Sequence, residues 1–172
     1  MDAIELAPPD PAWPDAFEQE AAHLRSVITP IMAVELHHIG STAVPGLAAK
    51  PIIDLMGGVA DLAVARERLV APLEAAGYAI WADNPAPDRL FFVKGLPPSA
   101  PRRTHHLHLV EPGPALDRHL AFRDHLRAHA SDRDAYQALK LDLATLHRDD
   151  REAYTHAKAD FIAEILNRAG VG

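Results

Sequence analysis

A small-residue turn and one carboxylate hold the most reactive chemistry of this sequence. Gly40, Ser41 and Thr42 follow a short apolar run, residues 31–39. A strand that ends in such a turn lets backbone N–H groups approach an anion closely, so the turn predicts a phosphate-binding loop. Asp54 lies in the next apolar run, where the alternation of side chains places its carboxylate among apolar neighbours beside the turn. The alternative is a buried acid that is satisfied by backbone donors or by Lys50.

Two histidines on a later alternating run, residues 104–111, add metal-ligand chemistry. His106 and His108 are two residues apart and therefore share one face of the predicted strand. Two imidazoles on one strand face can share a metal ion. The alternative is that one of them donates a hydrogen bond to Asp54 or to a phosphate without any metal.

Cationic side chains recur at helical spacing in the second half of the chain. Tyr136 and Tyr154 each precede a lysine by four residues, Lys140 and Lys158, and Arg123 lies one turn before a second arginine. Residues four apart face the same way on a helix, so each pair can present an aromatic ring and an ammonium group to one cleft. Such a cleft would suit a triphosphate or a nucleobase. The alternative for each pair is a tyrosine packed between helices with the lysine at its edge.

Composition narrows the class of protein. The chain has 172 residues, a formal charge of −7 and no cysteine. This length suits one hydrophobic core, so we expect a single domain over residues 1–172. The negative charge disfavours non-specific nucleic-acid binding, and the missing cysteines exclude disulfides and thiolate metal sites. No basic leader or membrane-spanning run is evident, so a cytoplasmic protein without membrane association is expected.

The elements that must position these residues are five strands and five helices. Alternation and turn residues predict the strands near residues 33–39, 51–57, 78–81, 90–94 and 104–111. Apolar spacing predicts one helix from Trp13 to Ile28 and one that Asp61 caps and that runs to Ala76. Three more helices follow Pro114, and Ser131 and Asp149 or Asp150 are their expected caps.

The segment from His38 to Leu47, together with residues 50–54, resembles the signature of the GrpB family, which is similar in fold to the nucleotidyltransferase superfamily. The resemblance extends from about Trp13 to Ala169. It implies that a Gly-Ser pair holds nucleotide phosphates and that two alternating acids on the next strand bind a divalent metal. Asp54 matches the first acid, but Met56 stands in the place of the second. Either His106 or His108 would then take the place of a third acid.

We therefore expect an α+β fold, a nucleotidyltransferase-like mixed β-sheet flanked by helices, with a C-terminal helical segment closing the cleft. The expected function is binding of a nucleoside triphosphate or another phosphorylated small molecule with Mg²⁺ or Mn²⁺, Zn²⁺ being the alternative. As an enzyme it would transfer a nucleotidyl group to an unknown acceptor. The expected residues are Asp54 for catalysis; Gly40, Ser41, Thr42, Lys50, Arg123, Lys140 and Lys158 for the nucleotide; and Asp54, His106 and His108 for the metal.

Two other functions remain open on the same residues. The missing second acid allows a non-catalytic module that senses nucleotide or aids folding, related to the GrpB-like domain that is fused to dephospho-CoA kinase in some bacteria. The histidine pair allows a metal hydrolase with zinc or manganese. The sequence makes no prediction of oligomeric state.

Overall fold

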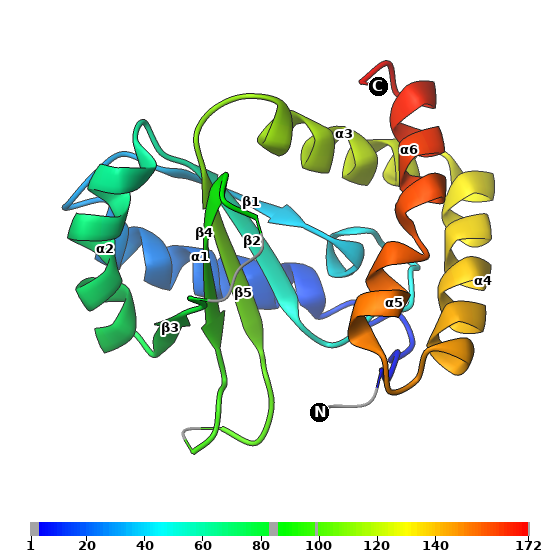
Figure 1. The fold of residues 1–172 in the computed structure, drawn as a ribbon, viewed down its shortest axis with the longest axis horizontal. Helices are drawn as coiled ribbons and strands as arrows, with labels where there is room; N and C mark the ends of the chain where they lie inside the picture. Colours follow the sequence, from blue (N-terminus) through cyan, green and yellow to red (C-terminus); the bar gives the residue numbers. More distant parts are fainter. Residues whose placement is uncertain (1–3, 83–85, 99, 172) are drawn as a thin grey trace.

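A five-stranded mixed sheet lies at the centre of the structure, a computed structural model that describes residues 4–82, 86–98 and 100–171 (Figure 1). The strand order is β1-β2-β5-β4-β3, in which only β2 and β5 run parallel. The strands are β1 (Glu35–Ile39), β2 (Ile53–Gly58), β3 (Tyr78–Ile80), β4 (Arg89–Lys94) and β5 (His105–Val110). All five lie where alternation predicted them, and the expected mixed α+β architecture is confirmed.

The pairing register brings the polar residues of the central strands together. Asp54 on β2 is opposite His106 on β5, and His108 lies between Met56 on β2 and Phe91 on β4. Since side chains alternate, these residues share one face of the sheet, as the sequence predicted. The intervening residues face the other side and form the main core.

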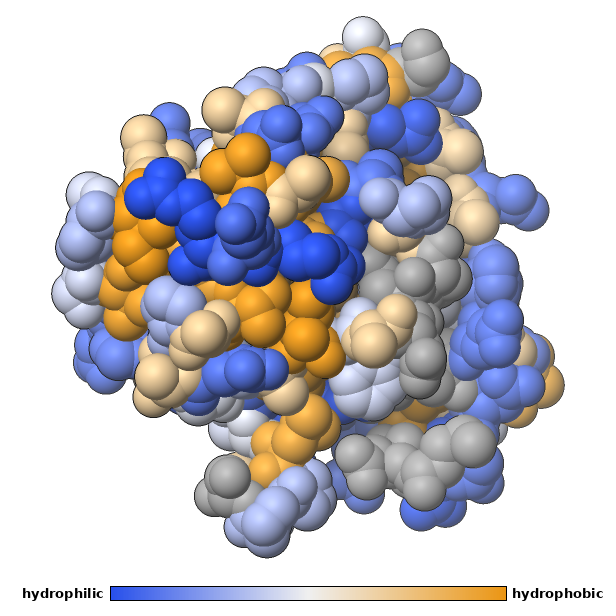
Figure 2. All heavy atoms as spheres, turned by 60° about the vertical axis from the view of Figure 1, so that its left-hand side comes forward, coloured by the Kyte–Doolittle hydropathy of each residue, from blue (hydrophilic) through white to orange (hydrophobic). Residues whose placement is uncertain are grey.

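Two helices cover that core side. They are α1 (Trp13–Ile28) and α2 (Leu62–Ala75), and Asp61 caps α2 by accepting a hydrogen bond of 2.9 Å from the Val64 backbone N–H, as predicted. Leu55, Leu107 and other inward residues of the sheet pack against both helices. Figure 2 brings the α2 side of the molecule forward and shows hydrophilic side chains lying over an apolar layer.

The C-terminal helices lie on the other side of the sheet (Figure 1). They are α3 (Pro114–Ala128), α4 (Ala130–Leu146), α5 (Arg151–His156) and α6 (Ala159–Arg168). Met56 is completely buried in an apolar cluster, against which Leu116 and Leu120 of α3 pack. Within the described ranges, no helix combines the length and the apolar character needed to cross a bilayer.

Two details of the helical half differ from the prediction. The expected third helix is interrupted by a turn at Ala157 and Lys158, so α5 and α6 are separate. Ser131 is not a cap, because α4 starts directly after His129, which also ends α3, and Ser131 falls inside the first turn. Asp150 does cap α5, accepting 2.9 Å from the Ala153 backbone N–H.

Candidate functional site

The predicted phosphate loop is a turn of 3-10 helix that touches the lone carboxylate. After β1 the chain passes through Gly40, with φ 72° and ψ −172°, into η1 (Ser41–Ala43). A Cβ atom on Gly40 would lie 2.6 Å from Asp54 Oδ2. The loop can therefore approach Asp54 this closely only because residue 40 has no side chain.

A buried histidine fixes the loop from inside the fold. His38 Nε2 donates a hydrogen bond of 2.9 Å to the Thr42 hydroxyl, which donates in turn to the Ile52 carbonyl at 3.4 Å. The imidazole stacks on Phe17 with the ring centroids 4.7 Å apart, and burial lowers the pKa of His38 to about 4. The side chain of Thr42, expected to bind nucleotide, is thus already used to hold the loop.

Two arginines of α3 hold the loop from outside. Arg123 donates to the His38 carbonyl at 2.9 Å and to the Asp124 carboxylate at 2.7 Å. Arg127 donates to the Ala43 carbonyl at 2.8 Å. Arg123 was expected to bind phosphate; its guanidinium lies against the His38 carbonyl, just before the loop, and is not among the residues that border the cleft described below.

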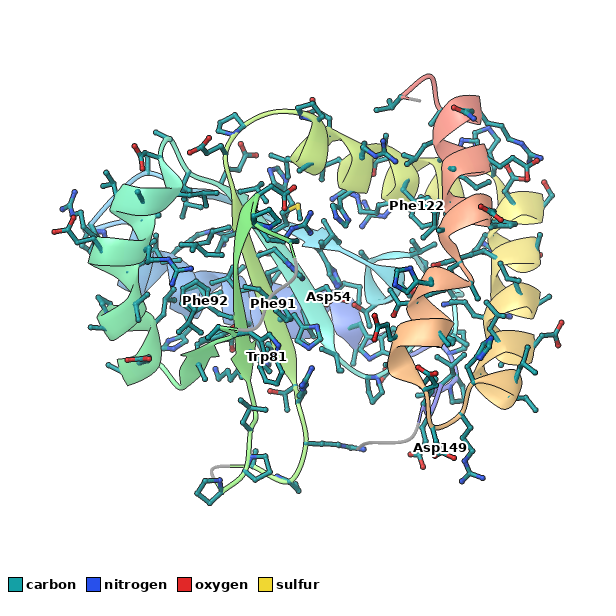
Figure 3. The ribbon with its side chains drawn as sticks, viewed as in Figure 1. Asp54, Trp81, Phe91, Phe92, Phe122 and Asp149 are labelled. Carbon is teal, nitrogen blue, oxygen red and sulfur yellow. The ribbon has the colours of Figure 1, made fainter. Side chains whose placement is uncertain are left out.

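The predicted metal ligands do come together. One potential ligand atom from each of Asp54, His106 and His108 lies within 4.8 Å of the others. His106 Nδ1 donates to Asp54 Oδ1 at 2.9 Å, as one of the alternative interpretations expected. Phe91 stacks on the His108 ring at 4.6 Å and contacts the His106 ring edgewise at 5.1 Å. In Figure 3, Asp54 and Phe91 lie on neighbouring parts of the same sheet.

Two nitrogens in this group lack a partner. His106 Nε2 and His108 Nδ1 are buried and make no hydrogen bond within the described chain. Burial lowers the pKa of His108 to about 3, so its imidazole is neutral at pH 7. Burial raises the pKa of Asp54, but the hydrogen bond from His106 and the neighbouring histidines outweigh it and hold that pKa below the ordinary value. An ionised carboxylate and a neutral imidazole are the forms that bind metals.

A cavity of about 280 Å³, which we call the lysine lobe, opens beside this group. Its charged and aromatic lining is Lys50, Asp54, Lys140, Tyr154 and Lys158, and Ser41 and His106 also border it. Two of the lysine ammonium groups lie over the ring of Tyr154, that of Lys158 at 4.1 Å from the centroid and that of Lys50 at 5.0 Å.

Lys140 is the most deeply placed of these cations. The residue is 2% exposed, and its ammonium group donates to Ser41 Oγ at 3.0 Å and to the Ala48 carbonyl. Burial, and then the charge of Lys158, lower the pKa of Lys140 to about 7. Burial also lowers the pKa of Lys158 to about 8, although Asp54 opposes this shift. In the described part of the chain, neither lysine forms an ion pair with a carboxylate.

A second cavity of about 310 Å³, the α3 lobe, continues from the first. It is lined by Phe122 of α3, Tyr136 of α4, and Ile162 and Leu166 of α6, with Arg118 and His119 also bordering it. Ser41, Asp54 and Lys158 line both lobes, so the two cavities meet at the carboxylate. Figure 3 shows Phe122 on α3, on the same side of the sheet as Asp54.

Comparison with known proteins agrees with this geometry. The profile of the family described as "GrpB protein" matches residues 3–168. The chain belongs to the GrpB family. A crystal structure of the conserved protein GrpB from Enterococcus faecalis superposes with a TM-score of 0.82 at 34% identity, covering 96% of each chain. The resemblance read from the Gly-Ser loop and the following strand is thereby confirmed.

Two relatives of this GrpB chain differ in length from it. A UPF0157 protein of Pseudomonas aeruginosa is 48% identical over 168 residues, which cover 98% of this chain and 68% of the relative. A Mycolicibacterium paratuberculosis protein named dephospho-CoA kinase is 34% identical over 188 residues, which cover 96% of this chain and 46% of the kinase. The GrpB chain therefore spans about half the length of that kinase.

The cleft of this GrpB chain unites most of the predicted site and adds an unexpected part. The predicted residues that border one lobe or both are Gly40, Ser41, Thr42, Lys50, Asp54, His106, Lys140 and Lys158. The α3 lobe was not foreseen. Arg118, His119 and Phe122 lie at helical spacing on one face of α3, and that spacing was the available signal.

Proposed function

We propose that this protein binds a nucleoside triphosphate together with a divalent metal ion and transfers its nucleotidyl group to an acceptor hydroxyl. The observation that carries the proposal is the position of Asp54. Its carboxylate lies close to His106 and His108, the two histidines that could bind a metal, and it borders the lysine lobe. It also lies directly against Gly40 of the small-residue loop.

The charge of the lysine lobe supports a ligand with several negative charges. Lys50, Lys140 and Lys158 border it, whereas Asp54 is its one carboxylate among the described residues and is already hydrogen-bonded to His106. Burial holds the pKa of Lys140 and of Lys158 low because the ammonium form is poorly solvated there. An anion would stabilise both charged forms, and a diphosphate or triphosphate brings enough charge for several lysines.

The donor atoms that Asp54, His106 and His108 offer support binding of a transition metal. Buried nitrogens that lack a hydrogen bond are uncommon in native structures, and metal ligation would satisfy His106 Nε2 or His108 Nδ1. One carboxylate and two imidazoles suit Mn²⁺ or Zn²⁺ better than Mg²⁺, which prefers oxygen ligands. When bound, the metal would neutralise charge on the phosphate oxygens. Asp54, His106 and His108 would hold it.

Nucleotide binding without transfer is the second candidate, and Met56 is the observation that favours it. The side chain is buried under α3, so the place of a second acid is filled by apolar packing. A site with one carboxylate would hold one metal ion rather than two. One relative is named dephospho-CoA kinase. Because dephospho-CoA is an adenine nucleotide, it is a specific ligand to test for such a module.

Calorimetric titration and a pyrophosphate assay test the proposal together. We expect ATP to bind in the presence of Mn²⁺, Asp54→Asn to weaken that binding, and pyrophosphate to be released once an acceptor is supplied. ATP or dephospho-CoA that binds without any release, whichever hydroxyl compounds are added, would support the non-catalytic module. Zinc retained through purification, with no affinity for any nucleotide, would instead support the hydrolase and contradict both nucleotide proposals.

A further inference from the structure

The two lobes of the cleft differ in chemistry although they share a boundary. Three ammonium groups border the lysine lobe, whereas the only lysine that reaches the α3 lobe, among the described residues, is Lys158 at the boundary. Phe122, Ile162 and Leu166 give the α3 lobe an apolar wall from two helices. A phosphate chain would gain little from such a wall. A flat, largely apolar group would gain from burial against it.

Resting on the proposed function, we infer that the α3 lobe holds the nucleoside of the nucleotide whose phosphates lie in the lysine lobe. Ser41, Asp54 and Lys158 line both cavities, so one ligand can pass from one lobe to the other beside the carboxylate. The ligand class is therefore a nucleotide with its base, not an inorganic polyphosphate. Phe122 is the residue that the base contacts.

The aromatic contacts favour Phe122 over Tyr136, which already stacks on Phe161 with the ring centroids 5.3 Å apart, and over Tyr154 of the lysine lobe. Tyr154 in the lysine lobe is only 3% exposed, and the ammonium groups of Lys50 and Lys158 already lie over its ring. Phe122 is only partly buried, and its one ring contact within the described chain is edgewise, with Tyr136 at 5.3 Å and 85°. A nucleobase could therefore stack on Phe122 without displacing a cation.

Arg118 and His119 give the α3 lobe polar groups for the edge of a base or for a ribose. Neither forms an ion pair or a side-chain hydrogen bond within the described ranges. Burial, and then the charge of Arg89, lower the pKa of His119, so its neutral ring can both donate and accept. Together with the hydroxyl of Tyr136, they are the polar side-chain groups of the lobe, among the described residues, that are not also part of the shared boundary.

Two probes separate this inference from the proposed function. ATP and inorganic tripolyphosphate, each with Mn²⁺, are titrated calorimetrically into the wild type, Phe122→Ala and Phe161→Ala. Phe161 is the matched control, since it packs in the same cluster and lies 5.3 Å from the same Tyr136 ring but does not line the lobe. We expect Phe122→Ala to weaken ATP about ten-fold and to leave tripolyphosphate unchanged. Phe161→Ala should change neither.

Each other outcome counts against a stated part. Unchanged ATP affinity in Phe122→Ala, or equal losses for ATP and tripolyphosphate, would overturn the nucleoside site while leaving phosphate binding in place. If neither probe binds the wild type, the proposed function is wrong and the nucleoside site with it.

Photolabelling of the wild type gives a readout that needs no variant. With Mn²⁺ present, 8-azido-ATP should attach to peptides from α3 or α6, and excess ATP should prevent the labelling. Labelling confined to peptides that contain Tyr154 or other residues of the lysine lobe would overturn the inference.

Discussion

Replacing Gly40 by alanine tests the close approach of the loop to Asp54. The new Cβ would lie 2.6 Å from Asp54 Oδ2. In addition, residues other than glycine rarely adopt the backbone conformation of this position, φ 72° and ψ −172°. Either the loop or Asp54 must move. Asp54 accepts a hydrogen bond of 2.9 Å from His106, so movement of the carboxylate breaks the bond that orients these two side chains.

The expected cost follows from these two contributions. Unfavourable backbone at such a position costs about 1–3 kcal/mol. Loss of a hydrogen bond to a charged group costs about 1.5–3 kcal/mol. Gly40→Ala should therefore lower the free energy of unfolding by roughly 3–5 kcal/mol, a large part of the 5–15 kcal/mol that is typical of a whole domain. Urea unfolding followed by circular dichroism measures this value.

A matched glycine isolates the contact from the backbone. Gly170 has a similar φ of 75°, but a Cβ added there would meet no described atom within 4 Å. Gly170→Ala should cost only about 1–2 kcal/mol. In an Asp54→Ala background, Gly40→Ala should become cheaper, because the carboxylate that the Cβ meets is gone. A Gly40→Ala cost equal to that of Gly170→Ala, or one unaffected by Asp54→Ala, would refute the reasoning.

Three further predictions concern protons, metal and helix ends. The free energy of unfolding should rise from about pH 7 to about pH 10, because the unfolded chain binds protons on Lys140 and Lys158 that the folded chain does not, and Lys140→Met should reduce that slope in pH-dependent urea titrations. His108→Phe should abolish Mn²⁺ binding measured by calorimetry without lowering the thermal midpoint, since it removes a buried nitrogen that has no partner among the described residues. A clear drop in the midpoint would show that this nitrogen is satisfied within the fold. Asp150→Ala should cost about 1 kcal/mol through the lost cap of α5, whereas Ser131→Ala should cost clearly less, and equal costs in urea unfolding would contradict the assigned helix starts.

The sheet was predictable because its signals are local. Each strand shows alternation or a short apolar run bounded by turn residues, and side-chain alternation alone placed Asp54 with Met56 and His106 with His108. That Asp54 and His106 would be direct neighbours was less accessible. It depends on the parallel register of β2 and β5, which are distant in sequence, and no local pattern specifies that register.

The C-terminal helices were less predictable because the roles of their residues depend on tertiary contacts. The apolar spacing from Tyr154 to Leu166 continues at helical period through the turn at Lys158, with no proline or glycine to mark it. Arg123 has the sequence features of a phosphate ligand, yet its position on α3 brings it to the outer side of the loop, against the His38 carbonyl. Charge and spacing indicate the available chemistry, whereas the packing of α3 decides where it is used.

Helix α3 contacts both the strand that carries Asp54 and the loop that begins at Gly40. Its Leu116 and Leu120 pack against Met56, the position at which the family resemblance implies a second acid. Arg123 and Arg127 donate to the carbonyls of His38 and Ala43, near the two ends of the predicted phosphate loop. A carboxylate at position 56 would be buried in that apolar cluster and would destabilise the fold unless the imidazole of His108, opposite it on β5, paired with it. Asp54 lies beside the imidazoles of His106 and His108, and imidazole ligands favour metals other than Mg²⁺. Under the proposed function, the apolar packing around Met56 is thus the physical reason to expect one metal ion held partly by imidazoles rather than a pair of magnesium ions.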